Sequence, residues 1–295
     1  MSIRLGYHAI TWGPDTLGAI KDISDLGFRG IECFTQVADQ YGDNPALFRR
    51  VLDDHGLRLV CLYGGGKMLR ATREEDVAYN RRVAEFVASI DGDRLNLGGG
   101  DRRRDADGQD HFTDDDIKEL CETMNQIGEA CRQIGVWACY HPHIGTIGEE
   151  KANVDRIFEL TDPELVYAGP DPAHLLLGGY DPLEFFDRYF DRIAYMHLKN
   201  VPAMYTAENW GNELARQQQA SASAAREGGA TTQVVPLFSE LNEGQIDLRA
   251  IVAMLRERGY DGWVTTEIDS TQKPSPRESA RGNRAFWESL DFTFD

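Results

Sequence analysis

The sequence lacks the long apolar segments of a membrane or secreted protein. It contains no run of about 18 apolar residues, so we expect no membrane-spanning helix. The first residues, "MSIRLGYHAITWG", contain no basic region followed by a long apolar core, so we expect no signal peptide. These absences predict a cytoplasmic protein with no membrane partner.

Cysteine is also scarce. The chain of 295 residues has five cysteines and no CxxC pair: Cys33, Cys61, Cys121, Cys131 and Cys139. An odd number without pair spacing in a long chain indicates reduced, mostly buried thiols rather than a disulfide framework. Cys139 falls inside an apolar strand pattern, where a buried thiol is a poor nucleophile.

Basic residues are few compared with acidic ones. The chain has 31 lysines and arginines against 49 aspartates and glutamates, a formal net charge of -18. Such a charge argues against nucleic acid or an anionic membrane surface as the main partner.

Several glycine motifs are absent. There is no GxSxG sequence, which argues against a serine hydrolase, and no GxGxxG loop follows the first strand pattern. The glycine triplets Gly64–Gly66 and Gly98–Gly100 follow strand patterns, but neither precedes a Lys-Ser/Thr pair. We interpret them as tight turns rather than phosphate loops, and we expect an unphosphorylated substrate.

The dominant feature that is present is an alternation of short apolar strands with helical patterns, repeated eight times. One example is a helix over 113–135 followed by a strand over 136–143. Thr113 is a plausible N-cap, and Gly27, Gly135 and Gly259 stand where helices should end. The pattern predicts an α/β fold, a (β/α)8 TIM barrel with one domain over residues 1–295; an open doubly wound sheet is the alternative.

One segment breaks this rhythm between the seventh and eighth strands. Residues 203–240 form a long insertion that contains "NELARQQQASASAAREGGATT", helical at first and then loop-like. A connection of this length is uncommon unless it serves as a lid or a contact surface. We hold a lid, a subunit contact and a merely solvated helical excursion as open alternatives.

Polar residues gather where the strands end, and in a barrel the carboxyl ends of the strands carry the chemistry. Five of the seven histidines stand at these ends. The residues are His8, Glu32, Tyr63, Asn96, His141, His143, Asp171, His174, His197, Lys199, Glu267 and Asp269. Chance would scatter histidines over helices and loops as well, so the concentration indicates a site.

A metal is the first explanation for this concentration. His141, Asp171, His197 and Glu267 come one each from strands five to eight and offer nitrogen and oxygen donors without thiolate. Such donors suit Mn²⁺, Co²⁺, Fe²⁺, Mg²⁺ or Zn²⁺. An ion held there would polarise a carbonyl and stabilise the enediolate formed when a neighbouring C–H is deprotonated.

The remaining polar residues are candidates for proton transfer and substrate binding. For the base that takes the proton, we place Glu267 first, then His143, then His174. Lys199 follows the strand alternation from His197, so it either holds an oxyanion or pairs with a carboxylate.

Substrate contacts are also expected from His8 and from the aromatic residues Trp12 and Tyr63. Aromatic rings offer apolar faces to a sugar ring, although packing in the core explains each of them equally well.

Five segments resemble a known family: "YHPHIGT", "DPAH", "HLKN", "GQIDL" and "GWVTTEID". Over nearly the whole chain they are similar to the xylose isomerase-like TIM barrels, the sugar phosphate isomerase/epimerase superfamily, and especially to its inosose dehydratase-like branch. The resemblance implies a divalent metal, manganese first, at the ends of strands five to eight. Asp171 and His174 match the family's Asp-x-x-His, His197 matches the histidine of its "HLKD", and Glu267 matches the carboxylate of strand eight.

One position departs from the family pattern. Many relatives carry a glutamate where this chain has His141, so His141, Glu149, Glu150 or a water completes the metal shell. "DPAH" in place of "DTGH", and Asn200 in place of an aspartate, are milder departures.

The resulting hypothesis is a metal-dependent enzyme that removes a proton α to a carbonyl on an unphosphorylated keto-sugar or inosose. The resemblance favours a dehydratase or lyase over a ketose isomerase, an epimerase or the subunit of a lyase that cleaves 3-keto-glycosides (C-glycosides). From other classes, a metal-dependent phosphodiesterase and a non-catalytic partner subunit stay open. Residues 203–240 could support a homo-oligomer or a partner subunit.

Overall fold

Eight parallel strands form a nearly closed barrel in the computed structural model, which describes residues 3–100, 112–226 and 234–294. The strands are β1 (Arg4–His8), β2 (Gly30–Phe34), β3 (Arg58–Gly66), β4 (Arg94–Gly99), β5 (Trp137–Tyr140), β6 (Val166–Ala168), β7 (Tyr195–Leu198) and β8 (Trp263–Thr266). Their order is β6-β5-β4-β3-β2-β1-β8-β7. A single parallel bridge between Ala168 and Ile193 joins β6 to the start of β7. The predicted TIM-barrel architecture is confirmed.

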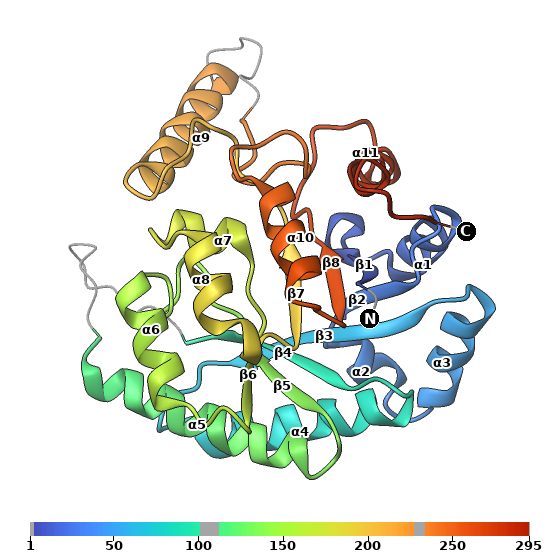
Figure 1. The fold of residues 1–295 in the computed structure, drawn as a ribbon, viewed down its shortest axis with the longest axis vertical. Helices are drawn as coiled ribbons and strands as arrows, with labels where there is room; N and C mark the ends of the chain where they lie inside the picture. The colour runs from blue at the N-terminus through green and yellow to red at the C-terminus, as the bar shows by residue number, and fades with distance from the viewer. Residues whose placement is uncertain (1–2, 101–111, 227–233, 295) are drawn as a thin grey trace.

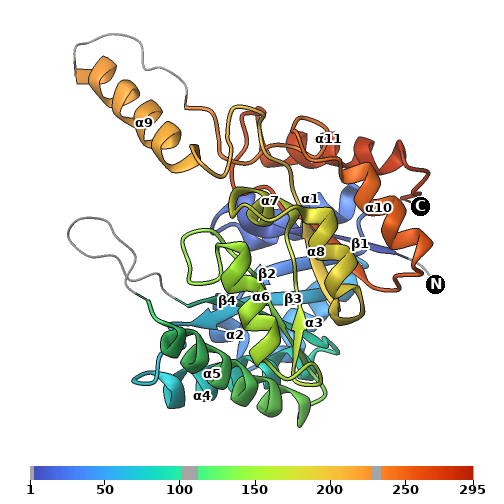
Figure 2. The same cartoon turned by 60° about the vertical axis from the view of Figure 1, so that its left-hand side comes forward.

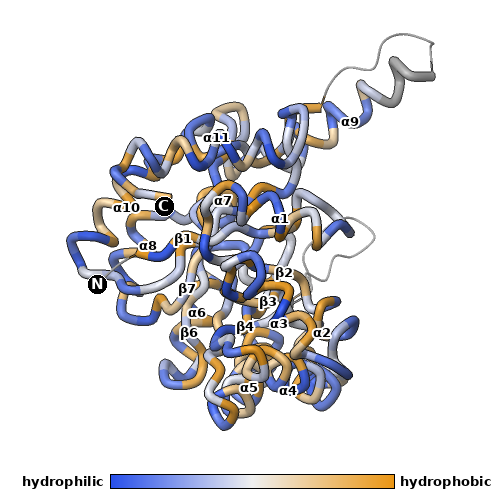
Figure 3. Tube along the Cα trace, turned by 90° about the vertical axis from the view of Figure 1, so that its right-hand side faces the viewer, coloured by the Kyte–Doolittle hydropathy of each residue, from blue (hydrophilic) through white to orange (hydrophobic). Residues whose placement is uncertain are grey.

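Helices surround this barrel (Figure 1). They are α1 (Thr16–Asp25), α2 (Gln36–Tyr41), α3 (Pro45–Asp54), α4 (Arg73–Ser89), α5 (Asp114–Arg132), α6 (Lys151–Leu160), α7 (Pro172–Leu177), α8 (Pro182–Tyr189), α9 (Trp210–Arg226), α10 (Leu248–Glu257) and α11 (Pro276–Glu288), with short 3-10 helices η1 (Ala9–Trp12) and η2 (Phe190–Arg192). Hydrophobic and hydrophilic residues alternate along α4 and α5 (Figure 3), as expected for helices with one buried face.

The predicted helix boundaries are confirmed at the residues with a cap signal. Thr113 and Asp116 form a reciprocal capping box at the start of α5. Gly27, Gly135 and Gly259 have φ values of 80°, 83° and 73°, the left-handed conformation that ends a helix at low cost for glycine.

The glycine triplets differ from the prediction. They do not form turns after the strands, because β3 runs to Gly66 and β4 to Gly99. At Gly65 φ is 128°, and a Cβ there would lie 1.7 Å from the carbonyl oxygen of Gly98. The two strands therefore approach so closely that a side chain would not fit between them.

The core has two main parts that hold the strand ends in place. The large cluster packs the helices onto the outside of the strands. A smaller one joins residues of β3, β5, β7 and β8, strands from opposite sides of the barrel, and so fills its interior: Val60, Cys61, Cys139, Ala194, Tyr195 and Trp263. All five cysteines are buried and free, as predicted.

The connection from β7 to α10 contains α9, which stands away from the barrel (Figures 1 and 2). Part of the predicted 203–240 segment, residues 227–233, lies outside the described residues. Within the described residues, no helix is both long enough and apolar enough to span a bilayer.

Matched leucine substitutions test the core. Leu255 in α10 is fully buried, whereas Leu17 in α1 is 55% exposed. We expect Leu255→Ala to lower the free energy of unfolding by about 2–5 kcal/mol because it leaves a cavity. Leu17→Ala should change it by less than about 0.5–1 kcal/mol. Urea denaturation followed by tryptophan fluorescence measures both, and equal losses would contradict this packing.

Candidate active site

Glu32 lies inside the barrel, fully buried, and links β2 to β7. Its Oε2 accepts hydrogen bonds from the Tyr195 hydroxyl and from His197 Nε2, the latter at 2.8 Å. A carboxylate only accepts, so Nε2 of His197 carries the proton. In the neutral form of the ring the lone pair is therefore on Nδ1, which lies 3.1 Å from Glu267 Oε2 and 3.9 Å from Asp171 Oδ2.

His141 is oriented in the same way by a backbone group. Its Nδ1 lies 2.9 Å from the carbonyl oxygen of Gly169, so Nδ1 is the donor and Nε2 has the lone pair. In Asp171, Oδ1 accepts from the Ala173 backbone N–H at 2.7 Å. This bond caps α7 and leaves Oδ2 to face the barrel mouth.

Three atoms at this point are buried without a hydrogen-bond partner: His141 Nε2, Asp171 Oδ2 and His197 Nδ1. Ligand atoms of these three residues lie within 4.8 Å of one another. Buried polar atoms without hydrogen bonds are costly unless an ion binds them. This set of two imidazole nitrogens and one carboxylate oxygen fits a divalent cation. Glu267, the fourth predicted ligand, lies beside this group, with Oε2 3.1 Å from His197 Nδ1.

Lys199 neutralises part of the negative charge. Its Nζ lies 2.6 Å from Glu267 Oε2, 3.3 Å from Asp171 Oδ2 and 3.0 Å from Asp269 Oδ1. Burial opposes the ammonium, but Asp269 and Glu267 outweigh it and raise the pKa of Lys199 well above its usual value. Of the two roles predicted for Lys199, pairing with carboxylates is the one seen.

The carboxylates differ in how easily they take a proton. Burial, opposed by Lys199 and His197, raises the pKa of Asp171 to about 6. Burial would also raise the pKa of Glu267, but His197 and Lys199 outweigh it and lower that pKa well below its usual value. Glu267 is therefore a weak base in this setting.

The pKa of His197 moves upwards in the ion-free protein. Burial alone would lower it, but the carboxylates of Glu267 and Glu32 raise it well above the usual value. A cation would therefore compete with a proton for Nδ1.

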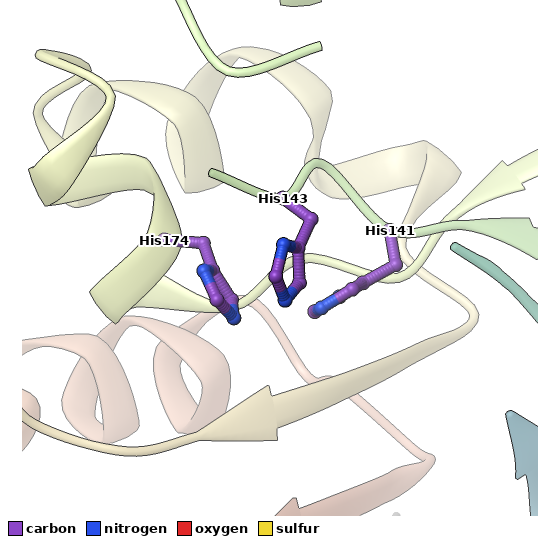
Figure 4. A group of neighbouring side chains, drawn as sticks. All are labelled: His141, His143 and His174. Carbon is purple, nitrogen blue, oxygen red and sulfur yellow. The ribbon is translucent and has the colours of Figure 1, made fainter. Parts of the chain in front are cut away.

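His143 and His174 form a pair of rings beside His141 (Figure 4), with centroids 3.7 Å apart. His143 Nδ1 lies 2.5 Å from the Ile144 carbonyl oxygen, which leaves the lone pair on Nε2. Neither ring nitrogen of His174 has a hydrogen-bond partner. Burial lowers the pKa of both residues, helped by Lys199 for His143 and by His143 for His174, so both rings are neutral near pH 7.

The predicted position of His174 was wrong. It was expected at a strand end, but it lies in α7, which begins directly after the Asp171 cap. Since one helical turn separates them, Asp171 and His174 still face the same mouth, and their ligand atoms join Glu267 in one group.

The fold places some of the predicted substrate contacts at the site and leaves another outside it. His8 belongs to the cluster, with Nε2 at 3.7 Å from Glu32 Oε1, and Nδ1 accepts from the Ile10 N–H. Burial lowers the pKa of His8. The half-buried ring of Tyr63 lies edge-on to His8 and His141.

Trp12 does not join this cluster. Its indole packs against Tyr7, and Nε1 donates to Asp22 in α1 at 3.0 Å. These contacts give Trp12 a packing role between β1 and α1.

Glu149 and Glu150 were alternatives to His141 as the fourth ligand. Glu149 accepts from the Gly145 N–H at 2.6 Å, and Glu150 is the exposed N-cap residue of α6. Neither appears among the ligand groups of the described residues, each of which has donor atoms within 4.8 Å.

Three residues of this site had no predicted role. Glu32 was noted at a strand end, but its bond to His197 was not foreseen. Tyr195 stands two residues before His197, so period-two alternation could have identified it. Phe238 lies 4.9 Å from His174, ring centroid to ring centroid, and no local pattern pointed to it.

The chain matches a known family over most of its length. The family described as "Xylose isomerase-like TIM barrel" matches residues 20–290. The chain belongs to this family.

Relatives of this xylose isomerase-like TIM barrel include an inosose dehydratase of Lacticaseibacillus casei, 28% identical over 298 residues, which cover 95% of this chain and 94% of the relative. Among solved structures, the probable 3-DHS dehydratase AsbF of Bacillus anthracis has a TM-score of 0.74 at 17% identity, covering 97% of this chain and 99% of AsbF. The IOLI protein, solved with a zinc atom, has a TM-score of 0.74 at 11% identity, covering 98% of each chain.

Two similar aspartates give a matched test of the ligand set. Asp171 caps α7 and Asp181 caps α8, each just before a proline and with the same type of side-chain bond. We expect Asp171→Asn to weaken Mn²⁺ binding by about 100-fold, because it removes a charged ligand, and Asp181→Asn to leave it unchanged. Isothermal titration calorimetry measures both, and equal affinities would remove Asp171 from the ligands.

The same measurement across pH tests the electrostatics. Because burial raises the pKa of Asp171 to about 6, its carboxyl is protonated below that pH and cannot bind a cation. Mn²⁺ affinity of the unmodified protein should fall by about ten-fold or more for each pH unit below 6. An affinity that stays constant from pH 7.5 to 5 would contradict this arrangement.

Proposed function

We propose that this protein is a divalent-metal-dependent lyase that dehydrates an unphosphorylated inosose or related keto-sugar. The observation that carries the proposal is the juxtaposition of the buried donors His141, Asp171 and His197 with the neutral imidazoles of His143 and His174. Dehydration is taken from the relatives named inosose dehydratase.

The cation would be held by His141, Asp171, His197 and Glu267, two nitrogen and two oxygen donors that suit manganese or zinc. When bound, it supplies a positive charge that draws electrons from a substrate carbonyl. Glu32 and Gly169 fix the two imidazoles by accepting from their other nitrogens, which keeps a lone pair of each ring directed at the ion.

His143 is the preferred base. Its Nε2 has a lone pair, its ring is neutral, and it is more exposed to the barrel mouth than His174. Glu267 is a weaker candidate than the sequence predicted, because His197 and Lys199 stabilise its anion.

Dehydration then needs two proton transfers, one from the substrate to His143 and one from His143 back to the substrate. The α C–H bond breaks, its proton passes to His143 Nε2, and its electron pair forms an enolate. That pair becomes a Cα=Cβ double bond as the β C–O bond breaks. The departing oxygen takes the proton from the His143 imidazolium and leaves as water, so the base ends neutral.

The charges of the site favour a neutral substrate. Three carboxylates are buried here, Glu32, Asp171 and Glu267, and Asp269 stands at the rim. Lys199 and a divalent cation balance most of this charge and leave no surplus for a phosphate group. We therefore propose a polyhydroxylated ketone without phosphate as the substrate. The free, buried cysteines support a cytoplasmic location for the enzyme.

Proton return is the alternative outcome of the same first step. If the enolate is reprotonated instead of losing hydroxide, the enzyme is an isomerase or epimerase, and His143 and His174 offer two imidazoles for such a transfer.

Solvent deuterium separates these outcomes. We expect the Mn²⁺-loaded protein in D₂O to incorporate deuterium at one α carbon of a pentahydroxycyclohexanone and to form an enone that absorbs in the ultraviolet. His143→Ala should slow both by about 10²–10⁴-fold, the usual contribution of a general base. Nuclear magnetic resonance follows the exchange and absorbance follows the enone.

The control is His55→Ala, because His55 bonds to the Val51 carbonyl oxygen in α3 and lies outside the cluster. Its rates should match the unmodified protein. If neither inososes nor keto-sugars exchange an α proton, the proposed function is wrong.

A further inference from the structure

The segment after β7 places an aromatic ring directly on the site. Phe238 is 6% exposed, and its ring centroid lies 4.3 Å from Lys199 Nζ. The same ring meets His174 edge-on, with centroids 4.9 Å apart at an angle of 71°. Phe238 therefore touches the site's ammonium and one of its two paired imidazoles.

Backbone pairing fixes the position of Phe238. Next to it, Ser239 exchanges two backbone hydrogen bonds with Asn200, at 2.9 and 3.3 Å. The Asn200 side chain donates to the Leu241 carbonyl oxygen and accepts from the Ile246 N–H, each at 2.9 Å. Asn200, two residues after β7, thus holds the part of the segment that follows Phe238.

A second anchor comes from the connection between β8 and α11. The buried carboxylate of Glu240 accepts from the Thr271 hydroxyl at 2.6 Å and from the Ser279 hydroxyl at 2.9 Å. Two anchored residues, Ser239 and Glu240, therefore follow Phe238 directly, so its ring has little freedom to leave Lys199.

The helix α9 holds the beginning of this segment. Gln217 of α9 accepts from the Val235 N–H at 2.8 Å and donates to the Tyr205 hydroxyl at 2.9 Å. The Tyr205 hydroxyl in turn donates to the Val235 carbonyl oxygen at 2.6 Å. Residues 235–240 therefore form one cover segment. Hydrogen bonds hold it to Asn200 after β7, to α9 and to the residues before and within α11.

The contacts of Lys199 show what the ring does. Three carboxylates attract its ammonium, and one of them, Asp269, is 34% exposed at the rim. Without an aromatic face opposite, the ammonium could follow Asp269 towards solvent. A buried cation–π contact biases such an equilibrium by about ten-fold or more.

We infer that Phe238 is a positioning residue that holds the Lys199 ammonium inside the mouth, where it donates a hydrogen bond to the departing β-oxygen of the substrate. The inference rests on the proposed function. A fixed donor at that oxygen favours breakage of the C–O bond over return of the proton, so Phe238 raises the ratio of dehydration to exchange.

Three substitutions test this role in the Mn²⁺-loaded protein with a pentahydroxycyclohexanone in D₂O. Phe238→Tyr keeps the aromatic face and should hold the ratio of enone formed to deuterium incorporated within about two-fold. Phe238→Leu keeps an apolar side chain without the face and should lower the ratio by about ten-fold. Phe238→Ala should lower it at least as much. Metal content should stay that of the unmodified protein in all three.

Leu237→Ala is the matched control, because Leu237 belongs to the same segment and packs against its apolar cluster rather than on Lys199. Its ratio should be unchanged. An unchanged ratio in Phe238→Leu, or an equal fall in Leu237→Ala, would overturn the inference while exchange itself continues. Absence of exchange in the unmodified protein would instead reject the proposed function.

Discussion

The neutralisation of buried negative charge is the constraint on which this site depends. Three carboxylates are enclosed at the mouth of the barrel, and a buried charge is costly unless a partner of opposite charge or a metal accompanies it. Lys199 supplies one positive charge within 2.6 Å of Glu267. Three buried atoms still have no hydrogen bond, one each on His141, Asp171 and His197. These are the atoms that fit a cation.

The barrel makes this arrangement possible because its strands are rigid and their carboxyl ends meet. The register pairs His8 with Glu32 across β1 and β2, while Glu32 reaches β7 through His197. The imidazoles of His141 and His197 are each oriented by an acceptor on another element, so their geometry depends on the closure of the barrel rather than on any one strand. The same closure brings Phe238, from the connection after β7, over Lys199.

The division of roles among the histidines follows from their partners. His141 and His197 each give one N–H to a fixed acceptor and keep the other nitrogen for a ligand. His143 also uses Nδ1 for a backbone carbonyl, and its ring lies beside that of His174. Burial keeps His143 and His174 neutral, the state that a base requires, whereas the carboxylates favour the charged form of His197 in the ion-free protein.

The sequence by itself determined the alternation of strands and helices, the helix ends at Thr113 and Gly135, and the polar residues at the strand ends. These follow from local periodicity and capping, which depend on residues close together in the chain. Only the tertiary structure decided that Glu32 orients His197, 165 residues away, that Phe238 lies over Lys199, and that Trp12 packs against α1 instead of the mouth. The physical reason is that such contacts arise when the barrel closes and distant segments pack, and no short-range pattern encodes which side chains then meet.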